Sequence, residues 1–177
     1  MWSLNHWTLN GLGKGTAFRL QISKRLNSEW YGDFIRTQYK NKVFRWDRHL
    51  TNCLMYYFRK LDDLEHKIHP FISASVFCLD ITEVEEVKPD GGGQKMGRFS
   101  FSQQFGLGTH YYLTERADIS VYAQYYAHLG NDIHVDEHDD GTIHIAEEKG
   151  RISLEGHMFL VFSVGYRLGD LWGKKKR

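Results

Sequence analysis

The segment from Met158 to Leu168 constrains the fold of this chain more than any other, because its apolar side chains alternate with small or polar ones. A period of two places every second side chain on the same face of a β-strand. One face carries Met158, Leu160, Phe162, Val164, Tyr166 and Leu168. The opposite face carries Ser163, Gly165 and Arg167. Apolar groups outside and small or polar groups inside are the pattern of a transmembrane β-barrel wall.

The composition is compatible with a β-barrel and argues against a transmembrane helix and against nucleic-acid binding. The 177 residues fit a single domain, expected over residues 1–177. The chain has no unbroken apolar run long enough for a transmembrane helix. A barrel strand needs no such run, because its apolar residues alternate with polar ones. With a formal net charge of +1, the chain lacks the excess of basic residues that is typical of nucleic-acid-binding proteins. We therefore expect no nucleic-acid partner, and the sequence indicates no cofactor.

The first residues contain no basic segment followed by an apolar core, so no secretory signal is visible. A protein of the bacterial outer membrane needs such a signal. We expect that it has been removed from a longer precursor, and that the protein lies in the outer membrane of a Gram-negative bacterium.

The same alternation recurs in further segments, and the connections between these segments are alternately short and long. With the last segment these predict eight strands, the others being Trp2 to Leu9, Thr16 to Leu26, Glu29 to Tyr39, Arg48 to Lys60, Pro70 to Thr82, Arg98 to Tyr112 and Ala117 to His128. Tight turns are predicted at Asn27–Ser28, Leu61–His66 and Leu113–Arg116, and long polar loops at Gly11–Gly15, Lys40–Asp47, Glu83–Gly97 and Leu129–Gly150. Bacterial barrels put short turns in the periplasm and long loops outside. The prediction is an all-β, up-and-down, eight-stranded antiparallel transmembrane β-barrel with both termini in the periplasm.

Aromatic side chains near the predicted strand ends agree with the girdles that barrels carry at each membrane interface. At the periplasmic ends lie Trp30, Tyr31, Tyr56, Tyr57, Phe58, Phe71, Tyr111, Tyr112 and Tyr166. At the outer ends lie Trp7, Phe44, Trp46, Phe77, Phe99, Tyr125 and Phe159. The alternative explanation is that aromatic residues simply favour strands.

Three segments carry a resemblance to a known group of proteins: Phe105–Thr114, Ile119–Tyr126 and Phe162–Leu168. Here the chain resembles the small outer-membrane barrels of the OmpX and OmpA-domain kind. The resemblance implies an architecture and no particular activity. We therefore favour an integral outer-membrane barrel without enzymatic activity, in a structural or adhesive role or as an accessory subunit of a membrane complex. Its implied partners are outer-membrane lipid and lipopolysaccharide, with other outer-membrane proteins as further candidates.

One segment suggests an enzyme instead. His128-Leu129-Gly130-Asn131 resembles in part the site of the lipid A deacylases, eight-stranded barrels whose motif has a histidine, a spacer, the nucleophilic serine and an asparagine. His128 and Asn131 match, and Glu137, Glu147 or Glu148 are candidates for the acid that orients the imidazole. The serine position holds Gly130, and a motif counts only when its roles are filled. A lipid A deacylase is therefore the alternative function.

A second candidate site is a polar loop that contains His134, Asp136, His138 and His144. Imidazole suits zinc, copper or nickel, and carboxylate suits calcium, so these side chains are candidate metal ligands. Their spacing matches no defined metal signature. We favour a solvated loop kept soluble by its charge.

The inward face of the predicted barrel is the third feature. It carries Arg19, Gln21, Arg98, Gln104, His110, Tyr122, Gln124 and Arg167, with Asp33 and Asp80 as candidate counter-charges. The interior of an eight-stranded barrel is just wide enough for side chains to fill. The sequence therefore predicts a hydrogen-bonded lumen network and no channel.

The two cysteines, Cys53 and Cys78, lie on strands joined by one hairpin. If Leu50 and Leu54 face lipid, Cys53 faces inward, whereas Ser75 in the lumen would turn Cys78 toward lipid. Adjacent strands form a disulfide only with both thiols on one face. We expect two free buried thiols.

A third functional hypothesis reverses the two faces. In a soluble lipocalin-like carrier of a small ligand, the apolar side chains would point inward. The apolar side chains of these strands are so large and numerous that they would fill the interior of an eight-stranded barrel and leave little cavity for a ligand.

Overall fold

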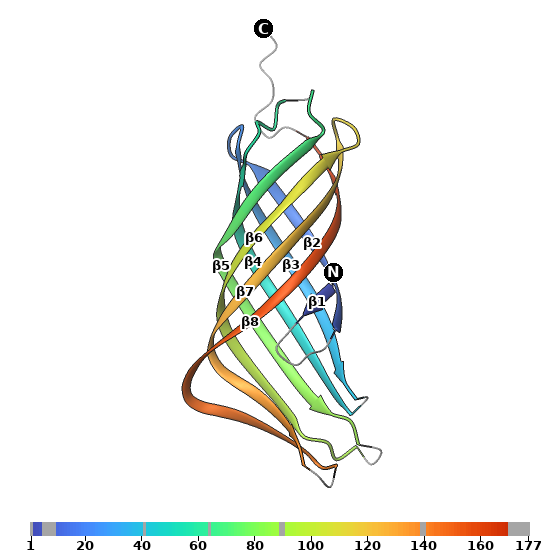
Figure 1. The fold of residues 1–177 in the computed structure, drawn as a ribbon, viewed down its shortest axis with the longest axis vertical. Helices are drawn as coiled ribbons and strands as arrows, with labels where there is room; N and C mark the ends of the chain where they lie inside the picture. Colours follow the sequence, from blue (N-terminus) through green and yellow to red (C-terminus); the bar gives the residue numbers. More distant parts are fainter. Residues whose placement is uncertain are drawn as a thin grey trace.

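The computed structural model of the chain describes residues 2–4, 10–40, 42–63, 65–88, 91–138 and 141–169. Antiparallel β-strands close into one barrel, in which each strand pairs with its neighbours in sequence and the last pairs with the first (Figure 1). The eight strands are β1 Trp2–Leu4, β2 Asn10–Gln21, β3 Leu26–Tyr39, β4 Val43–Tyr57, β5 Ile68–Glu86, β6 Lys95–Tyr112, β7 Ala117–Glu137 and β8 Ile143–Tyr166. The predicted architecture is therefore confirmed. None of the described residues forms a helix long and apolar enough to cross a membrane.

The outer surface of the barrel is apolar and the inner surface is largely polar. Val164 and Leu107 are 80% and 66% exposed, whereas Gln104 and His110 are fully buried. The face that the last strand was predicted to turn outward does point outward. The lipocalin-like alternative is wrong, because it requires these apolar side chains in the lumen.

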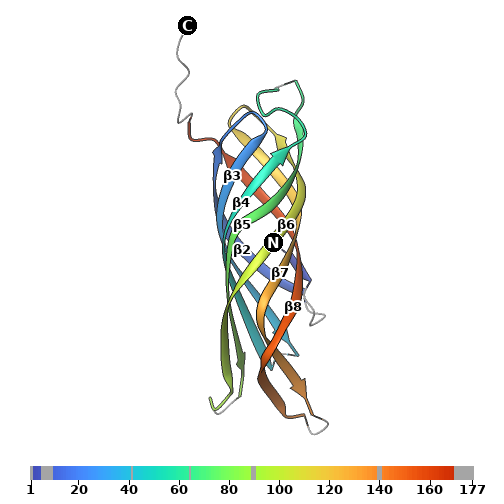
Figure 2. The ribbon, with the colours of Figure 1, turned by 90° about the vertical axis from the view of Figure 1, so that its left-hand side faces the viewer.

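The strands extend further than the alternation predicted. Gly11–Gly15, taken as a loop, belongs to β2, and most of the predicted loops Lys40–Asp47 and Leu129–Gly150 is strand. The predicted loop Glu83–Gly97 is shortened to the connection between Glu86 and Lys95. Figures 1 and 2 show hairpins β5–β6 and β7–β8 projecting from one end, here called the hairpin end; the opposite end is the turn end. In these projections the apolar side chains of Val84, Ile133, Ile143 and Ile145 are buried in one small cluster and the residues that alternate with them are polar. This reverses the apolar-outside pattern of the wall, so a search for that pattern did not reveal them. Glu147–Gly150, expected at the end of the long loop Leu129–Gly150, lie within β8.

The turn between β2 and β3 also differs from its predicted position. Asn27 and Ser28 are turn-forming residue types, yet both lie in β3, and the chain turns at residues 22–25. The side-chain Nδ2 of Asn27 donates to Tyr57 Oη at 3.2 Å, and Ser28 Oγ accepts from Asn52 Nδ2 at 2.9 Å. Interactions across the sheet therefore override the local turn preference. Of the predicted first strand, Trp2–Leu4 is strand and residues 5–9 lie outside the described part.

A β-bulge in β5 changes the facing of one cysteine. The pairing register of β5 shifts by one residue against both of its neighbours, β4 and β6, and Val76 is the extra residue. Val76 and Phe77 both point outward. Cys78 consequently faces inward, which corrects the prediction of a lipid-facing side chain. Both cysteines are buried and free, as predicted. Opposite the bulge, Gln103 Nε2 donates to the carbonyl oxygen of Ser75 at 2.7 Å, which explains a polar residue on the apolar face of β6.

Only some of the predicted girdle aromatics point outward. Those that do include Trp30, Tyr56, Phe58, Tyr111 and Tyr166 near the turn end, with Phe99 and Tyr125 nearer the hairpin end. The inward-facing ones are Tyr31, Tyr57, Phe71 and Phe159, all buried in the lumen. Adjacent aromatics such as Tyr56 and Tyr57 necessarily fall on opposite faces of a strand. The girdle itself remains a prediction, and Trp7 lies outside the described residues.

A carboxylate near the tip of hairpin β7–β8 ties it to the turn between β3 and β4. The Lys40 ammonium donates to Glu137 Oε2 and that of Lys42 to Oε1, and these bonds hold the pKa of the Glu137 carboxyl below its usual value.

We expect this contact to make the hairpin tip acid-sensitive. A depressed folded-state pKa contributes stability that is present above the unfolded pKa, about 4.3, and is lost as pH falls through the lower folded value. Amide-exchange protection factors at the tip should therefore fall in that acidic range, and Glu137→Gln should lower protection at neutral pH and remove the pH dependence. Equal pH profiles for the two proteins would contradict this.

Candidate functional site

The middle of the lumen is filled by apolar and aromatic side chains. One continuous buried cluster comprises Tyr31, Ile35, Cys53, Met55, Tyr57, Leu61, Phe71, Cys78, Tyr122, Tyr126, Phe159 and Val161. Within it, the hydroxyls of Tyr31 and Tyr126 are 2.7 Å apart, and Gln124 Nε2 donates to Tyr31 Oη at 3.1 Å. The sequence predicted Tyr122 and Gln124 in the lumen but missed this aromatic layer, which separates two polar groups.

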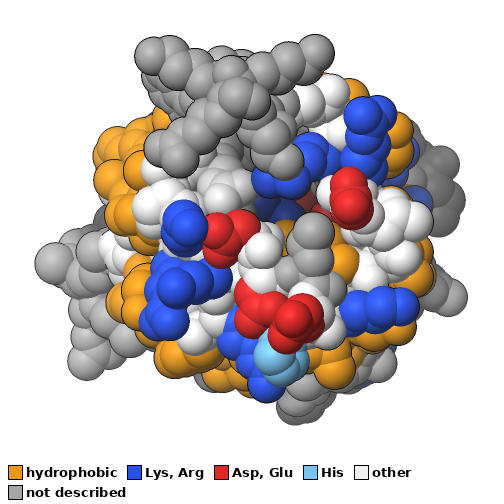
Figure 3. Space-filling view, turned by 90° about the horizontal axis from the view of Figure 1, so that it is seen from above, with side chains coloured by type: hydrophobic (Ala, Val, Ile, Leu, Met, Phe, Trp, Pro, Cys, Tyr) orange, Lys and Arg blue, Asp and Glu red, His pale blue; other side chains and the backbone are white. Residues whose placement is uncertain are grey.

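The first polar group lies toward the turn end. Arg19 Nε donates to Glu29 Oε2 at 2.8 Å, and His110 Nδ1 lies 3.1 Å from Asp118 Oδ1 and is hydrogen-bonded to Ser120 Oγ. Viewed from this end, charged side chains gather over the barrel mouth and apolar ones form much of its perimeter (Figure 3). The structure thus joins the predicted residues Arg19 and His110 to two acids that the sequence analysis did not single out.

Two other predicted lumen residues lie at the rim of the turn end. Arg167 Nη2 donates to Gln21 Oε1 at 2.9 Å, and the Arg167 side chain is exposed. Arg167 follows the last residue of β8, where the wall ends, and its place in the lumen network stays a prediction. Gln104 is inside as predicted, and its Nε2 donates to Ser73 Oγ at 3.2 Å.

The second polar group lies on the hairpin side of the aromatic layer and is built around Asp80. Asp33, His49 and Asp80 are cross-strand partners on β3, β4 and β5, so their inward-facing side chains meet. His49 Nδ1 lies 2.7 Å from Asp33 Oδ1, and its Nε2 lies 3.4 Å from Asp80 Oδ1. From β7, His128 Nδ1 lies 2.9 Å from Asp80 Oδ2 and 2.6 Å from Ser102 Oγ of the intervening strand β6.

A buried ion pair adjoins this group. Arg45 Nε donates to both carboxylate oxygens of Asp47, at 3.0 Å each, and Thr82 Oγ1 donates to Asp47 Oδ1 at 2.7 Å. The predicted lumen residue Arg98 also belongs here, with Nη2 3.6 Å from Asp80 Oδ2. Buried charges require such partners.

The residues proposed for deacylation are not arranged as a catalytic triad. In a triad the histidine uses one ring nitrogen for the serine and the other for the acid. Here Ser102 and Asp80 both approach Nδ1 of His128, whose side chain is turned inward and buried. Glu137 is bound to lysines near the hairpin tip, and the Asn131 side chain lies outside the described residues.

The histidines of the predicted polar loop lie on hairpin β7–β8. His138 and His144 are exposed, with ring centroids 6.5 Å apart, and Asp136 is the cross-strand partner of His144. Within the described residues, neither these side chains nor His134 belong to a group of three potential metal ligands. Such a group does occur in the lumen: His49, Asp80 and His128 each offer one ligand atom within 4.8 Å of the others.

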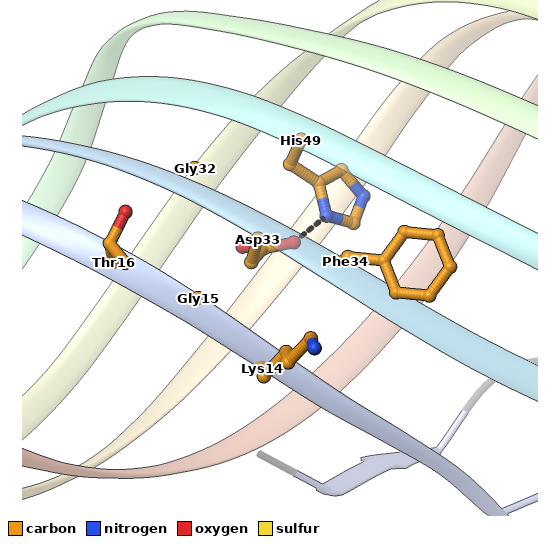
Figure 4. A pocket seen from close by; sticks show the side chains of 7 residues that line it. All are labelled: Lys14, Gly15, Thr16, Gly32, Asp33, Phe34 and His49. Carbon is orange, nitrogen blue, oxygen red and sulfur yellow. Dashed lines mark hydrogen bonds and ion pairs between the residues drawn. The ribbon is translucent and has the colours of Figure 1, made fainter.

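An open groove of about 390 Å³ lies beside two residues of this lumen site, Asp33 and His49 (Figure 4). It is lined by Lys14, Gly15, Thr16, Gly32, Asp33, Phe34 and His49. Two of the lining residues, Gly15 on β2 and Gly32 on β3, carry no side chain. A Cβ atom at Gly15 would lie 2.9 Å from Asp33 Cβ, so the close approach of β2 to β3 requires glycine there.

Comparison with known protein families gives no matching family model, and no curated protein sequence matches the chain. Among solved structures, the crystal structure of Neisserial surface protein A (NspA) matches with a TM-score of 0.61 over 94% of this chain and 90% of that chain. The chain has the fold of an outer-membrane β-barrel. At 11% sequence identity the likeness to NspA shows the fold alone.

Proposed function

We propose that this protein is an integral outer-membrane barrel that neither conducts solutes nor catalyses a reaction, and that it acts through its projecting hairpins. The observation that carries the proposal is the filled lumen. Tyr57, Tyr126 and Phe159 are almost completely buried within the aromatic layer. An eight-stranded barrel packed in this way has no continuous aqueous path.

The lengths of the last two strands support a role outside the membrane. A tilted transmembrane strand needs about 9–11 residues. Strands β7 and β8 have 21 and 24 residues, so about half of each is available beyond the bilayer. A structural, adhesive or accessory role would use this surface.

Cations on the outward face support lipopolysaccharide as a partner. Lys14, Arg36 and Arg48 are all exposed near the hairpin-end limit of the apolar surface. Arg36 Cζ lies 4.1 Å from the ring centroid of Phe44, and Arg48 donates to Glu83 at 3.0 Å. Cations beside aromatic side chains suit the boundary between acyl chains and anionic headgroups. We infer that the hairpin end lies on the extracellular side of the membrane and that these cations contact lipid phosphates.

Planar-bilayer recordings test the absence of conduction. The refolded protein should give no discrete current steps above those of protein-free bilayers, because the aromatic layer closes the lumen. A Tyr126→Ala, Phe159→Ala double variant removes two of its large side chains and should conduct at least as readily as the native protein. Regular current steps from the native protein would overturn the proposal.

A further inference from the structure

We propose that the groove at Gly32 binds one bisphosphorylated glycolipid of the lipid A class, with an acyl chain over Gly32 and a phosphate between Lys14 and Arg48. This deepens the proposed partnership with lipopolysaccharide, because it names one site and the part of the lipid that is bound there. It rests on the proposed orientation, in which the hairpin end lies on the extracellular side of the membrane.

The groove is a depression beside outward-facing side chains of β2 and β3. Four of its lining residues lie on the outward face of these strands: Lys14, Thr16, Gly32 and Phe34. Thr16 and Gly32 are cross-strand partners, and Gly32 has no side chain to fill the space beside Thr16 (Figure 4). A Cβ atom at Gly32 would have the carbonyl oxygen of His49 as its neighbour, at 3.8 Å, so the space above Gly32 is open.

Apolar side chains continue this depression toward the turn end. Leu50 is the cross-strand partner of Gly32, and Phe18 and Trp30 are cross-strand partners one step closer to the turn end. All three side chains are exposed on the outer surface. An acyl chain that lies over Gly32 therefore stays in contact with apolar surface along its length, and burial of that surface stabilises the complex.

Two cations lie on the hairpin side of the groove. Phe34 is the cross-strand partner of Lys14 on one side and of Arg48 on the other. Adjacent strands are about 4.8 Å apart, so the Cα atoms of Lys14 and Arg48 are about 10 Å apart and their long side chains can reach one phosphate between them. Arg48 Cζ lies 5.9 Å from the ring centroid of Phe34, which places the guanidinium beside a groove residue.

The ion pair of Arg48 with Glu83 leaves donors for a ligand. Glu83 Oε2 accepts from Nη2 of Arg48 at 3.0 Å, and a guanidinium carries five N–H donors. A third cation lies one step closer to the hairpin end: Arg36, whose Cζ is 4.1 Å from the ring centroid of Phe44. The outward surface beside the groove thus carries three cations and one acid.

This charge selects the class of lipid. Arginine and lysine bind phosphate through charge-assisted hydrogen bonds. Lipid A carries two phosphates and no cation, which suits a surface with an excess of positive charge. Phosphatidylethanolamine carries one phosphate and its own ammonium group, so it offers no net negative charge to these side chains.

The direct test is native mass spectrometry of the full, detergent-refolded chain titrated with purified lipid A. One lipid A molecule per chain should remain bound after the free lipid is diluted. Gly32→Leu should weaken binding by about tenfold or more, because the leucine occupies the space of the acyl chain. The Lys14→Gln, Arg48→Gln double variant should also weaken it by about tenfold or more, because the phosphate loses its charged donors.

Two matched controls separate the groove from the rest of the surface. Ala74→Leu adds the same apolar bulk at an exposed position on β5, and Lys67→Gln removes an exposed cation at the turn end. Both should bind lipid A as the native protein does. Folding of each variant is checked by its heat-dependent electrophoretic shift. Equal losses in the controls and in the groove variants, or no loss in the groove variants, would overturn the site.

A competition between lipids on the native protein needs no variant. Lipid A without its phosphates, and phosphatidylethanolamine, should each bind about tenfold or more weakly than lipid A. Equal binding of the three lipids would mean an unspecific lipid contact only and would overturn the proposal. Absence of bound lipid A would overturn it as well.

The orientation is tested separately, because binding in detergent does not depend on it. His138→Cys places an exposed thiol near the hairpin tip, whereas both native cysteines are buried. A membrane-impermeant maleimide should label this variant on intact cells. Absence of labelling would overturn the proposed orientation, and with it the role of lipopolysaccharide, even if lipid A binds in detergent. Normal labelling without selective binding of lipid A would overturn the site alone.

Discussion

Replacing Leu107 by arginine should destabilise the folded barrel in a lipid bilayer by about 2–4 kcal/mol. Leu107 lies on β6, is 66% exposed, and has outward-facing Ile72 as its neighbour on β5. No lumen contact is altered, so the cost arises from placing a guanidinium among acyl chains. Reversible urea unfolding in phospholipid vesicles, followed by tryptophan fluorescence, measures this free energy directly.

The matched control for this substitution is Val87→Arg. Val87 is also an exposed aliphatic residue, but it lies after the end of β5, beside Lys88, where the wall is already polar. The same change of charge should there alter the unfolding free energy by less than about 1 kcal/mol. Equal effects at the two positions would show that the apolar surface around Leu107 is not in contact with lipid.

The wall of the barrel was predictable because its signal is local. In β8, alternation alone assigns Val164 outward, and the structure agrees. The projecting hairpins escaped prediction because their apolar side chains, such as Ile133 and Ile143, are buried while the alternating residues are polar, the reverse of the wall. The backbone pairing nevertheless continues as far as Glu137 opposite Ile143.

The facing of Cys78 shows where the period-two rule fails. The bulge at Val76 shifts every later residue of β5 by one position, so Cys78 and Asp80 both turn inward. Two consecutive apolar residues, Val76 and Phe77, in an otherwise alternating strand were the available signal.

The lumen site could be predicted only in fragments. His49 lies two residues before Thr51 and four before Cys53 in β4, so the inward assignment of Cys53 also implied that His49 faces inward. That signal was present and was not used. The meeting of His49, Asp80 and His128 depends on the register of strands distant in sequence, which no local pattern encodes.

Removing the positive partner of the buried pair Arg45–Asp47 should have the other large effect on stability. Arg45→Met is expected to cost about 3–5 kcal/mol, because it leaves Asp47 charged and buried without the guanidinium that binds both of its carboxylate oxygens. The adjacent exposed pair provides the control. Arg48 donates to Glu83 at 3.0 Å on the outer surface, and Arg48→Met should cost at most about 1 kcal/mol.

A second substitution distinguishes lost charge pairing from lost packing at Arg45. If the unpaired carboxylate causes the destabilisation, adding Asp47→Leu to Arg45→Met should recover a large part of the stability, because no buried charge then remains at the pair. The cycle of two single variants and the double variant isolates this coupling in urea unfolding experiments. Strictly additive losses would instead mean that Arg45 stabilises the barrel through its other contacts, which include His157 Nε2 at 3.4 Å from Arg45 Nη2.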